Sequence, residues 1–264
     1  MPDKLIILDY SGTLSLDAAA FSRSDNLIHH LQRSGLFAMG VNSAALFWEI
    51  VNATWPKGSI SRLGYKSVMQ ERIAELFPEK SLVKQAEASR SVANFVDSYF
   101  DHFRIDEHWR LILERLSSDK SVNVIIATDH YAEATDAIIK HFGQWNIPAV
   151  TLSADVKSNI LVANSADLGM HKDQQQFWRK VNNVLRQNYN RILLIDDFGQ
   201  NEQQGDAYSD SIKVNERRKT TVTILRAVFA VDVEVIAFTA QDKQIGVLIA
   251  ETSARIDQFF CGGL

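Results

Sequence analysis

The chain has 264 residues, of which 46% are hydrophobic and 23% are charged, and it carries a formal net charge of −4 at pH 7. This composition provides enough apolar side chains for a sizeable buried core, in one large domain or in one domain with an insertion. The acidic net charge gives no electrostatic basis for binding a nucleic acid or a membrane surface. We therefore expect a small molecule as the partner, with no nucleic acid and no membrane.

The cysteine content and the length of the apolar runs indicate in which cellular compartment the protein is expected. The single cysteine, Cys261, excludes an intramolecular disulfide and a cysteine-rich metal site, which fits a reducing compartment. The apolar runs have the length of strands, far below the roughly 20 residues that cross a bilayer. The first residues lack the apolar segment and cleavage site of a signal peptide. The sequence therefore predicts a cytoplasmic protein.

Four short apolar runs rich in β-branched residues set the expected architecture: residues 5–8, 122–127, 160–163 and 192–195. Segments with helical periodicity separate the later runs, and this alternation predicts an α/β fold with a Rossmann-like, doubly wound parallel sheet. Polar residues directly follow three of the runs: Asp9, Thr128 and the pair Asp196-Asp197. We expect these side chains at the carboxyl edge of the sheet, where such folds bind ligands.

The first two runs are separated by a long segment without a convincing strand. Apolar residues recur there at spacings of three and four over residues 44–51, 67–77 and 83–103, while residues 55–59 (Trp-Pro-Lys-Gly-Ser) interrupt the pattern and indicate a loop. We predict an all-helical cap domain over residues 16–103, inserted into a core domain of residues 1–15 and 104–264. Further core elements are expected as helices over 107–116, 130–142 and 216–229, a strand over 233–239, and a strand plus helix over 245–260.

The first run leads into the motif Asp9-Tyr10-Ser11-Gly12-Thr13-Leu14. A carboxylate stands at the end of the expected strand, and the glycine permits a sharp turn. Taken alone, this pattern is equally typical of an ordinary turn after a strand. Its interpretation depends on the segments that follow it.

Two of these segments offer groups that suit an anionic ligand. Thr128 ends a strand with a hydroxyl that can donate to an oxygen of such a ligand without adding charge, although alone it is as typical of a helix cap. Lys172 follows the third run, and its ammonium would offset the repulsion between Asp9 and an anion. That repulsion costs roughly 4 kcal/mol for unit charges about 4 Å apart at an effective dielectric near 20. Lys157 is the competing lysine, but it precedes the run.

The pair Asp196-Asp197 places two adjacent carboxylates directly after a strand. Near Asp9 these carboxylates would repel one another, so a hard divalent cation is the natural remedy. Ligation by oxygen alone, with no nearby histidine or cysteine, points to Mg²⁺. An acidic helix N-terminus would explain Asp197, but it explains the complete set poorly.

In this order along the chain, the four motifs resemble the signature of the haloacid dehalogenase (HAD) superfamily, and the resemblance covers nearly the whole sequence. It implies that Asp9 is a nucleophile that forms an aspartyl-phosphate during hydrolysis of a small phosphorylated metabolite. Thr128 and Lys172 would then bind the transferring group. The implied ligands of Mg²⁺ are Asp9, Asp196 and the backbone carbonyl of Ser11, with Asp197, Asn201 or Glu202 acting directly or through water.

Ser11 departs from the pattern of this family. Most phosphatases of the superfamily have an aspartate at this position, where it protonates the leaving group and later activates water. Acid–base help of this kind contributes typically about 10² to 10⁴ in rate. Three alternatives stay open: a phosphatase-like hydrolase for good leaving groups, C–P cleavage like that of phosphonoacetaldehyde hydrolases, and a catalytically weak member that binds a phosphometabolite or a protein partner. The dehalogenase branch is disfavoured because it dispenses with the acidic pair.

Asp129 and His130 follow Thr128 and are candidates to replace the missing acid and base if they point into the site. A histidine on the surface is the commoner outcome. The Schiff base of the C–P alternative would need a cap lysine, for which Lys57 and Lys66 are the candidates.

The cap segment 55–66 is expected to close over the site, where Arg62 and Tyr65 would bind the remote part of a substrate. A solvated cation is the commoner role for such an arginine. Several aromatic residues are expected to be structural, because they lie in helical apolar patterns or lack the spacing of metal ligands: Trp48, Trp109, Trp178, His102 and His108.

Overall fold

A computed structural model describes residues 2–78, 85–153, 158–202, 211–240 and 244–262. Within these ranges the strands form one parallel sheet in the order β3-β4-β2-β1-β5-β6. The strands are β1 (Lys4–Leu8), β2 (Val122–Thr128), β3 (Ala149–Thr151), β4 (Ile160–Asn164), β5 (Arg191–Asp196) and β6 (Val233–Ala237). The predicted α/β class with a parallel sheet is therefore confirmed.

The central strands form where apolar, β-branched residues are buried on both faces of the sheet, as parallel strands require. Every residue of β2 and β4 is buried. The four apolar runs and the strand expected near residue 233 correspond to β1, β2, β4, β5 and β6. Strand β3 was not predicted from the sequence, because it has only three residues and its central Val150 is 36% exposed.

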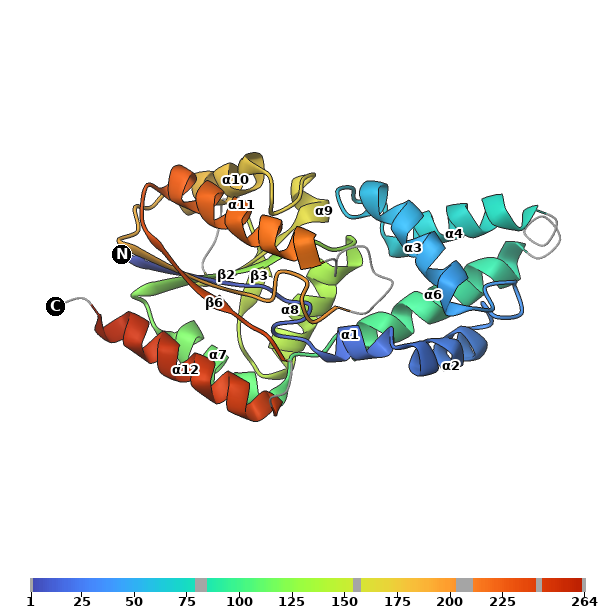
Figure 1. Ribbon diagram of the computed structural model, residues 1–264, viewed down its shortest axis with the longest axis horizontal. Helices are drawn as coiled ribbons and strands as arrows, with labels where there is room; N and C mark the ends of the chain where they lie inside the picture. The colour runs from blue at the N-terminus through green and yellow to red at the C-terminus, as the bar shows by residue number, and fades with distance from the viewer. Residues whose placement is uncertain (1, 79–84, 154–157, 203–210, 241–243, 263–264) are drawn as a thin grey trace.

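Helices cover both faces of this sheet (Figure 1). One layer, which packs on Ile6, Leu8 and Val124, contains α7 (Arg110–Ser118), α8 (Glu133–Gln144) and α12 (Ile245–Cys261) together with the short helix η1 (Glu107–Trp109). The other layer packs on Leu5 and Ile7 and contains α9 (Ser165–Leu168), α10 (Gln175–Leu185) and α11 (Ser211–Phe229). Neighbouring residues of β1 thus point to opposite layers, because side chains alternate along a strand.

Two details of the predicted core were wrong. The segment from residue 245 is helical throughout as α12, because its apolar residues recur at helical spacing and are buried. These residues are Leu248, Ile249, Ile256 and Phe259. Helix α8 begins at Glu133 rather than at residue 130.

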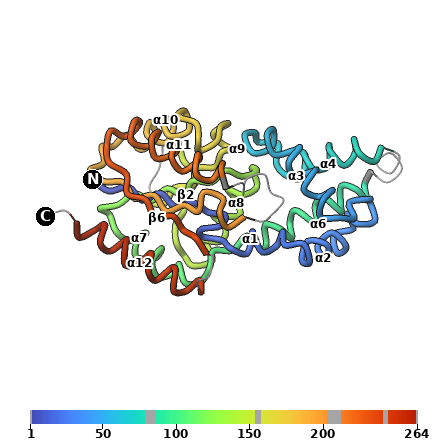
Figure 2. Tube along the Cα trace, viewed as in Figure 1, coloured from blue at the N-terminus to red at the C-terminus, as the bar shows by residue number. Residues whose placement is uncertain are grey.

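Between β1 and β2 the chain forms a separate group of helices beyond one end of the sheet (Figure 1). They are α1 (Asp17–Phe21), α2 (Ser24–Ser34), α3 (Ala44–Gly58), α4 (Tyr65–Leu76) and α6 (Gln85–His102). Helix α6 carries the chain back toward the core (Figure 2). The helices pack on one another through buried residues such as Leu31, Phe47, Ile50 and Phe95. In the part of the chain that the structure describes, no helix is long and apolar enough to cross a bilayer.

The loop predicted at residues 55–59 was wrong, because α3 continues through Pro56 and ends at Gly58. Proline removes one backbone hydrogen bond from a helix. Here the helix end is held by other contacts, since both the backbone N–H and the hydroxyl of Ser59 donate to the carbonyl of Trp55. Gly58 lets α3 approach the core closely, because a Cβ atom at this position would lie 2.5 Å from the ring of Tyr131.

Candidate active site

The ends of β1, β2 and β5 bring the polar residues of three predicted motifs to one edge of the sheet. Leu8 is in register with Ile126 of β2 and Ile195 of β5, so the residues that follow lie side by side. The backbone N–H of Asp9 donates to the carbonyl of Ile195 at 2.9 Å. The strand register thus positions Asp9, Thr128 and Asp196 before any side-chain contact is considered.

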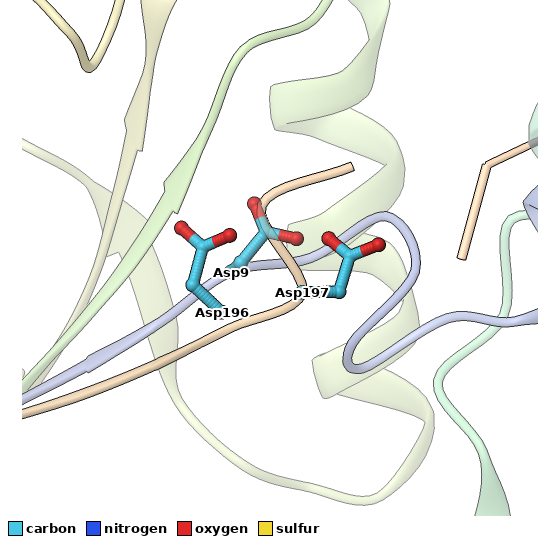
Figure 3. A group of neighbouring side chains, drawn as sticks. All are labelled: Asp9, Asp196 and Asp197. Atoms are coloured by element: carbon cyan, nitrogen blue, oxygen red, sulfur yellow. The ribbon is translucent and has the colours of Figure 1, made fainter. Parts of the chain in front are cut away.

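Asp9, Asp196 and Asp197 form a compact acidic cluster (Figure 3). Each of these residues is at least 95% buried, and oxygens of the three carboxylates lie within 4.8 Å of one another. Burial of like charges at this separation is costly unless a cation compensates for it. A set of carboxylate oxygens is also the donor chemistry that hard divalent cations prefer, so these residues fit such an ion.

Backbone groups fix the orientation of the acidic pair. Asp196 Oδ1 accepts from the N–H of Phe198 at 2.7 Å, and the Asp197 carboxylate accepts from Gly199 at 3.0 Å and from Asn201 at 2.8 Å. The loop after β1 passes close by at Gly12, which has a φ of +75°. A Cβ atom at Gly12 would lie 2.4 Å from Asp197 Oδ2, so glycine is required there for steric as well as conformational reasons.

Lys172 joins the cluster from the loop between α9 and α10. Its Nζ lies 2.6 Å from Asp9 Oδ1 and 3.0 Å from Asp196 Oδ2, and the side chain is buried. The indole N–H of Trp178 donates to the Lys172 carbonyl at 2.7 Å, and the Lys172 N–H donates to Asp129 at 3.0 Å. The competing candidate, Lys157, lies outside the described residues.

The electrostatics of the cluster follow from this geometry. Burial raises the pKa of Asp9 well above its usual value, and the ammonium of Lys172 opposes this shift. Burial likewise raises the pKa of Asp197, with further contributions from Glu202 and Asp196. The one ammonium of Lys172 contacts two of the three carboxylates, and a further cation bound there would favour the charged form of all three.

No protein-family model and no curated protein matches the sequence. Solved structures do resemble this one. A HAD family enzyme from Bacteroides thetaiotaomicron superposes with a TM-score of 0.52 and 10% identity over 93% of this chain and 98% of that one. A predicted HAD-like family hydrolase from Porphyromonas gingivalis superposes with a TM-score of 0.51 and 13% identity, over 96% of this chain and 98% of that one.

This chain has the HAD fold. The resemblance inferred from the four motifs is confirmed at the level of the fold. At these identities the likeness extends no further, so the roles of individual residues rest on their geometry.

Ser11 follows Asp9 by two residues in the loop after β1, where the sequence resemblance implied a missing acid and base. Its hydroxyl donates to Glu202 Oε1 at 2.8 Å. Asn201 supports the same loops, because its side-chain amide donates to the carbonyl of Gly12 at 2.6 Å and to that of Phe238 at 2.8 Å. Glu202 therefore lies beside Ser11, whereas the side chain of Asn201 holds the backbone.

The residues after β2 differ in what they contact. Asp129 accepts the N–H of Lys172, and burial raises its pKa. The expectation of a surface histidine was wrong for His130, which is 95% buried. His130 Nδ1 accepts the backbone N–H of Tyr131 at 2.8 Å, and Nε2 lies 2.9 Å from the hydroxyl of Tyr99. Burial lowers the pKa of His130 to about 3, so its ring is neutral near pH 7.

The cap cations that the sequence suggested do not line the cavity above the carboxylates. Lys57 pairs with Glu71 at 2.9 Å and Lys66 with Asp97 at 2.5 Å, both on the surface. The side chain of Arg62 is 77% exposed and lies 3.8 Å from Asp167. Tyr65, in contrast, is buried and lines the cavity.

A cavity of about 370 Å³ connects the acidic cluster with the helices between β1 and β2. Its lining includes Trp55, from the cap segment expected to close over the site, and Trp48, which was wrongly expected to be only structural. It also includes three residues that the sequence did not single out, namely Tyr99, Lys213 and Arg217. The sequence contained a signal for Trp48 and Trp55, because they share the three- and four-residue spacing of one helix face with Val51 and Asn52. His102 and His108 lie outside this cavity, as expected for structural residues.

Proposed function

We propose that this protein is a magnesium-dependent hydrolase that cleaves a small phosphate monoester through an aspartyl-phosphate on Asp9. The observation that carries the proposal is the contact of Lys172 Nζ with both Asp9 and Asp196, at 2.6 and 3.0 Å. A buried carboxylate held against an ammonium, at one end of a cavity, suits nucleophilic attack on an anionic phosphoryl group.

The first step forms a bond between an Asp9 oxygen and phosphorus while the bond from phosphorus to the leaving oxygen breaks. Lys172 and the hydroxyl of Thr128 would hold oxygens of the transferring group and stabilise its charge. Water would then attack the aspartyl-phosphate, which returns the Asp9 carboxylate and releases inorganic phosphate.

Asp9, Asp196, Asp197 and the Ser11 carbonyl would hold Mg²⁺, which would neutralise charge on the phosphoryl oxygens. Support comes from the acidic cluster itself and from one HAD family enzyme of Bacteroides thetaiotaomicron, a mutant of which was solved in complex with magnesium and inorganic phosphate. That structure has a TM-score of 0.50 and 11% identity over 94% of this chain and 99% of that one.

C–P cleavage through a Schiff base is less well supported by the geometry. Such a reaction needs a lysine from the cap that reaches the substrate. Both candidates, Lys57 and Lys66, pair with surface carboxylates and lie outside the cavity. We therefore favour hydrolysis of an ester, with residues 16–103 as a cap domain over the core.

The proposal is tested with para-nitrophenyl phosphate and Mg²⁺, comparing the wild type with Asp9→Asn. We expect the variant to lose hydrolysis, whereas the control Asp232→Asn, on a fully exposed side chain, keeps it. Beryllium fluoride, which mimics a phosphoryl group on aspartate, should raise the melting temperature of the wild type with Mg²⁺ and not that of Asp9→Asn. If the wild type and Asp9→Asn both bind para-nitrophenyl phosphate and neither hydrolyses it, the catalytically weak alternative would be favoured.

A further inference from the structure

The cavity has two ends of different chemistry. The core contributes the carboxylates, Lys172 and the cations of α11, of which Arg217 donates to the carbonyl of Phe198 beside the acidic pair. The segment between β1 and β2 forms the second wall, whose residues include Ser22, Trp48, Val51, Asn52, Trp55 and Tyr99. Over the described residues, this second wall contains no Asp, Glu, Lys or Arg. The charged side chains of the cavity therefore lie on the core side, around Asp9, where the phosphoryl group would bind.

Helix α3 presents one face to this cavity. Trp48, Val51, Asn52 and Trp55 line it at the spacing that places helical residues on one side. Trp48, Val51 and Trp55 are only partly buried, so apolar surface remains for a ligand to cover. Covering such apolar surface stabilises a complex, because it removes that surface from water.

The tyrosines opposite α3 form contacts with other parts of the protein. The hydroxyl of Tyr99 lies 2.9 Å from His130 Nε2, and that of Tyr131 lies 3.1 Å from Thr54 Oγ1. The ring of Tyr65 stacks on Tyr131 with centroids 4.1 Å apart and planes 4° apart. These contacts fix the three rings beside a neutral His130, with Tyr65 and Tyr131 buried and Tyr99 partly exposed.

We propose that the substrate is an aryl phosphate, whose uncharged aromatic ring lies against Trp48 and Trp55 of α3 while its phosphate lies at Asp9. This inference rests on the proposed function and names its substrate class. A sugar or other polyol would find few polar side chains to bind on this wall, because Ser22 and Asn52 are its non-aromatic polar residues among those described.

The same class of substrate suits the replacement of the expected acid by Ser11. As Asp9 attacks phosphorus, the bond from phosphorus to the aryl oxygen breaks and the electron pair leaves with the aryloxide. A phenol has a pKa near 10, against about 16 for water, so the aryloxide departs without a proton from residue 11. In the second step, water hydrolyses the aspartyl-phosphate and gives up a proton to solvent, and the aryloxide takes one from solvent.

Binding of non-hydrolysable phosphonates to the Mg²⁺-loaded protein separates recognition of the ring from catalysis. Phenylphosphonate and methylphosphonate carry the same charged group and differ in the ring. We expect phenylphosphonate to bind at least about tenfold more tightly in calorimetry, since apolar pockets discriminate by about 10- to 200-fold per methylene group. Equal affinities would overturn the proposal.

Variants of the wall extend this comparison. Trp55→Ala and Val51→Asp should each lower the ratio of the two affinities, because the first removes an aromatic face and the second places a charge on the apolar face of α3. Trp55→Phe should restore most of the ratio. The control is Phe37→Ala, at an aromatic residue that is 38% exposed and outside the cavity. An unchanged ratio in both wall variants, with the wild-type fold retained, would also overturn the proposal.

Turnover of acetyl phosphate distinguishes this inference from the proposed function. Its leaving group departs easily but lacks a ring. Hydrolysis that depends on Asp9, together with equal phosphonate affinities, would leave the proposed function standing and overturn the aryl preference. Preferential binding of phenylphosphonate without hydrolysis of any phosphate would overturn the proposed function and leave recognition of an aromatic ring standing.

Discussion

Lys172 Nζ lies 2.6 Å from Asp9 Oδ1, although 163 residues separate the two in the chain. The contact joins the end of β1 to the loop before α10, and the same ammonium reaches Asp196 at 3.0 Å. The ammonium of Lys172 opposes the rise in the pKa of the buried Asp9 carboxylate, and its position supports the proposed role of Lys172 in binding the transferring group.

Replacement of Lys172 by methionine should lower both activity and stability. Loss of one partner of a buried ion pair costs about 3–5 kcal/mol, because a charge is left without compensation. We expect urea denaturation to show a loss of this size in chelator-treated protein, and a smaller loss with Mg²⁺. The control Lys57→Met removes an exposed pair worth about 0–1 kcal/mol. Equal losses in the two variants would contradict the assignment.

Magnesium should stabilise the protein through the acidic cluster. A ligand at about 100 times its dissociation constant raises the free energy of unfolding by about 2.7 kcal/mol. Thermal denaturation of the wild type should shift upward with Mg²⁺, and Asp196→Asn should abolish most of the shift. The exposed Asp232→Asn serves as the control. A full shift in Asp196→Asn would mean that the ion binds elsewhere.

The metal-free protein should lose stability as pH rises. The pKa of Asp197 is raised from 3.8 to about 8 by burial and by the neighbouring Glu202 and Asp196. Because the folded state then binds more protons than the unfolded state, this contribution is fully present below pH 3.8 and is lost as pH rises through about 8. Denaturation in chelator at several pH values should show this fall, and Asp197→Asn should flatten it. A profile that Asp197→Asn leaves unchanged would refute this explanation.

Ser11→Asp should raise the hydrolysis of alkyl phosphates. The Ser11 hydroxyl donates to Glu202 at 2.8 Å, so a carboxylate introduced there would lie beside another carboxylate, which favours its protonated form. We expect kcat/KM for glycerol phosphate to rise by at least about tenfold, which is less than the 10² to 10⁴ that well-positioned acid–base catalysis supplies. Ser11→Ala is the matched control. No gain from the aspartate would indicate that another residue already acts as the acid and base.

The sheet and its edge were predictable from the sequence because the local signals agreed with the tertiary structure. Buried apolar runs gave the central strands, and parallel register then placed Asp9, Thr128 and Asp196 side by side. The contact of Lys172 with Asp9 and Asp196 follows from loop geometry that no periodicity encodes. Lys172 was predicted as a site residue only from its position along the chain, relative to the other motifs.

The helices between β1 and β2 were harder to predict. Pro56 indicated a break, yet contacts of Ser59 and the docking of Gly58 against Tyr131 keep α3 helical. Trp48 lies in a helical apolar pattern, and a partly buried tryptophan that lines a cavity cannot be distinguished from a core residue by spacing. His130 was expected on the surface, and only its tertiary contacts with Tyr99 and Tyr131 reveal that it is buried and neutral.

The most direct test of the account is detection of the covalent intermediate. Mg²⁺-loaded protein would be mixed with para-nitrophenyl phosphate, quenched rapidly in acid, digested and analysed by mass spectrometry. We expect one added phosphoryl group on the wild-type peptide that contains Asp9, and none on the same peptide of the Asp9→Asn variant. Hydrolysis of the ester at the same rate by the wild type and Asp9→Asn, with no phosphoryl group on this peptide, would contradict it.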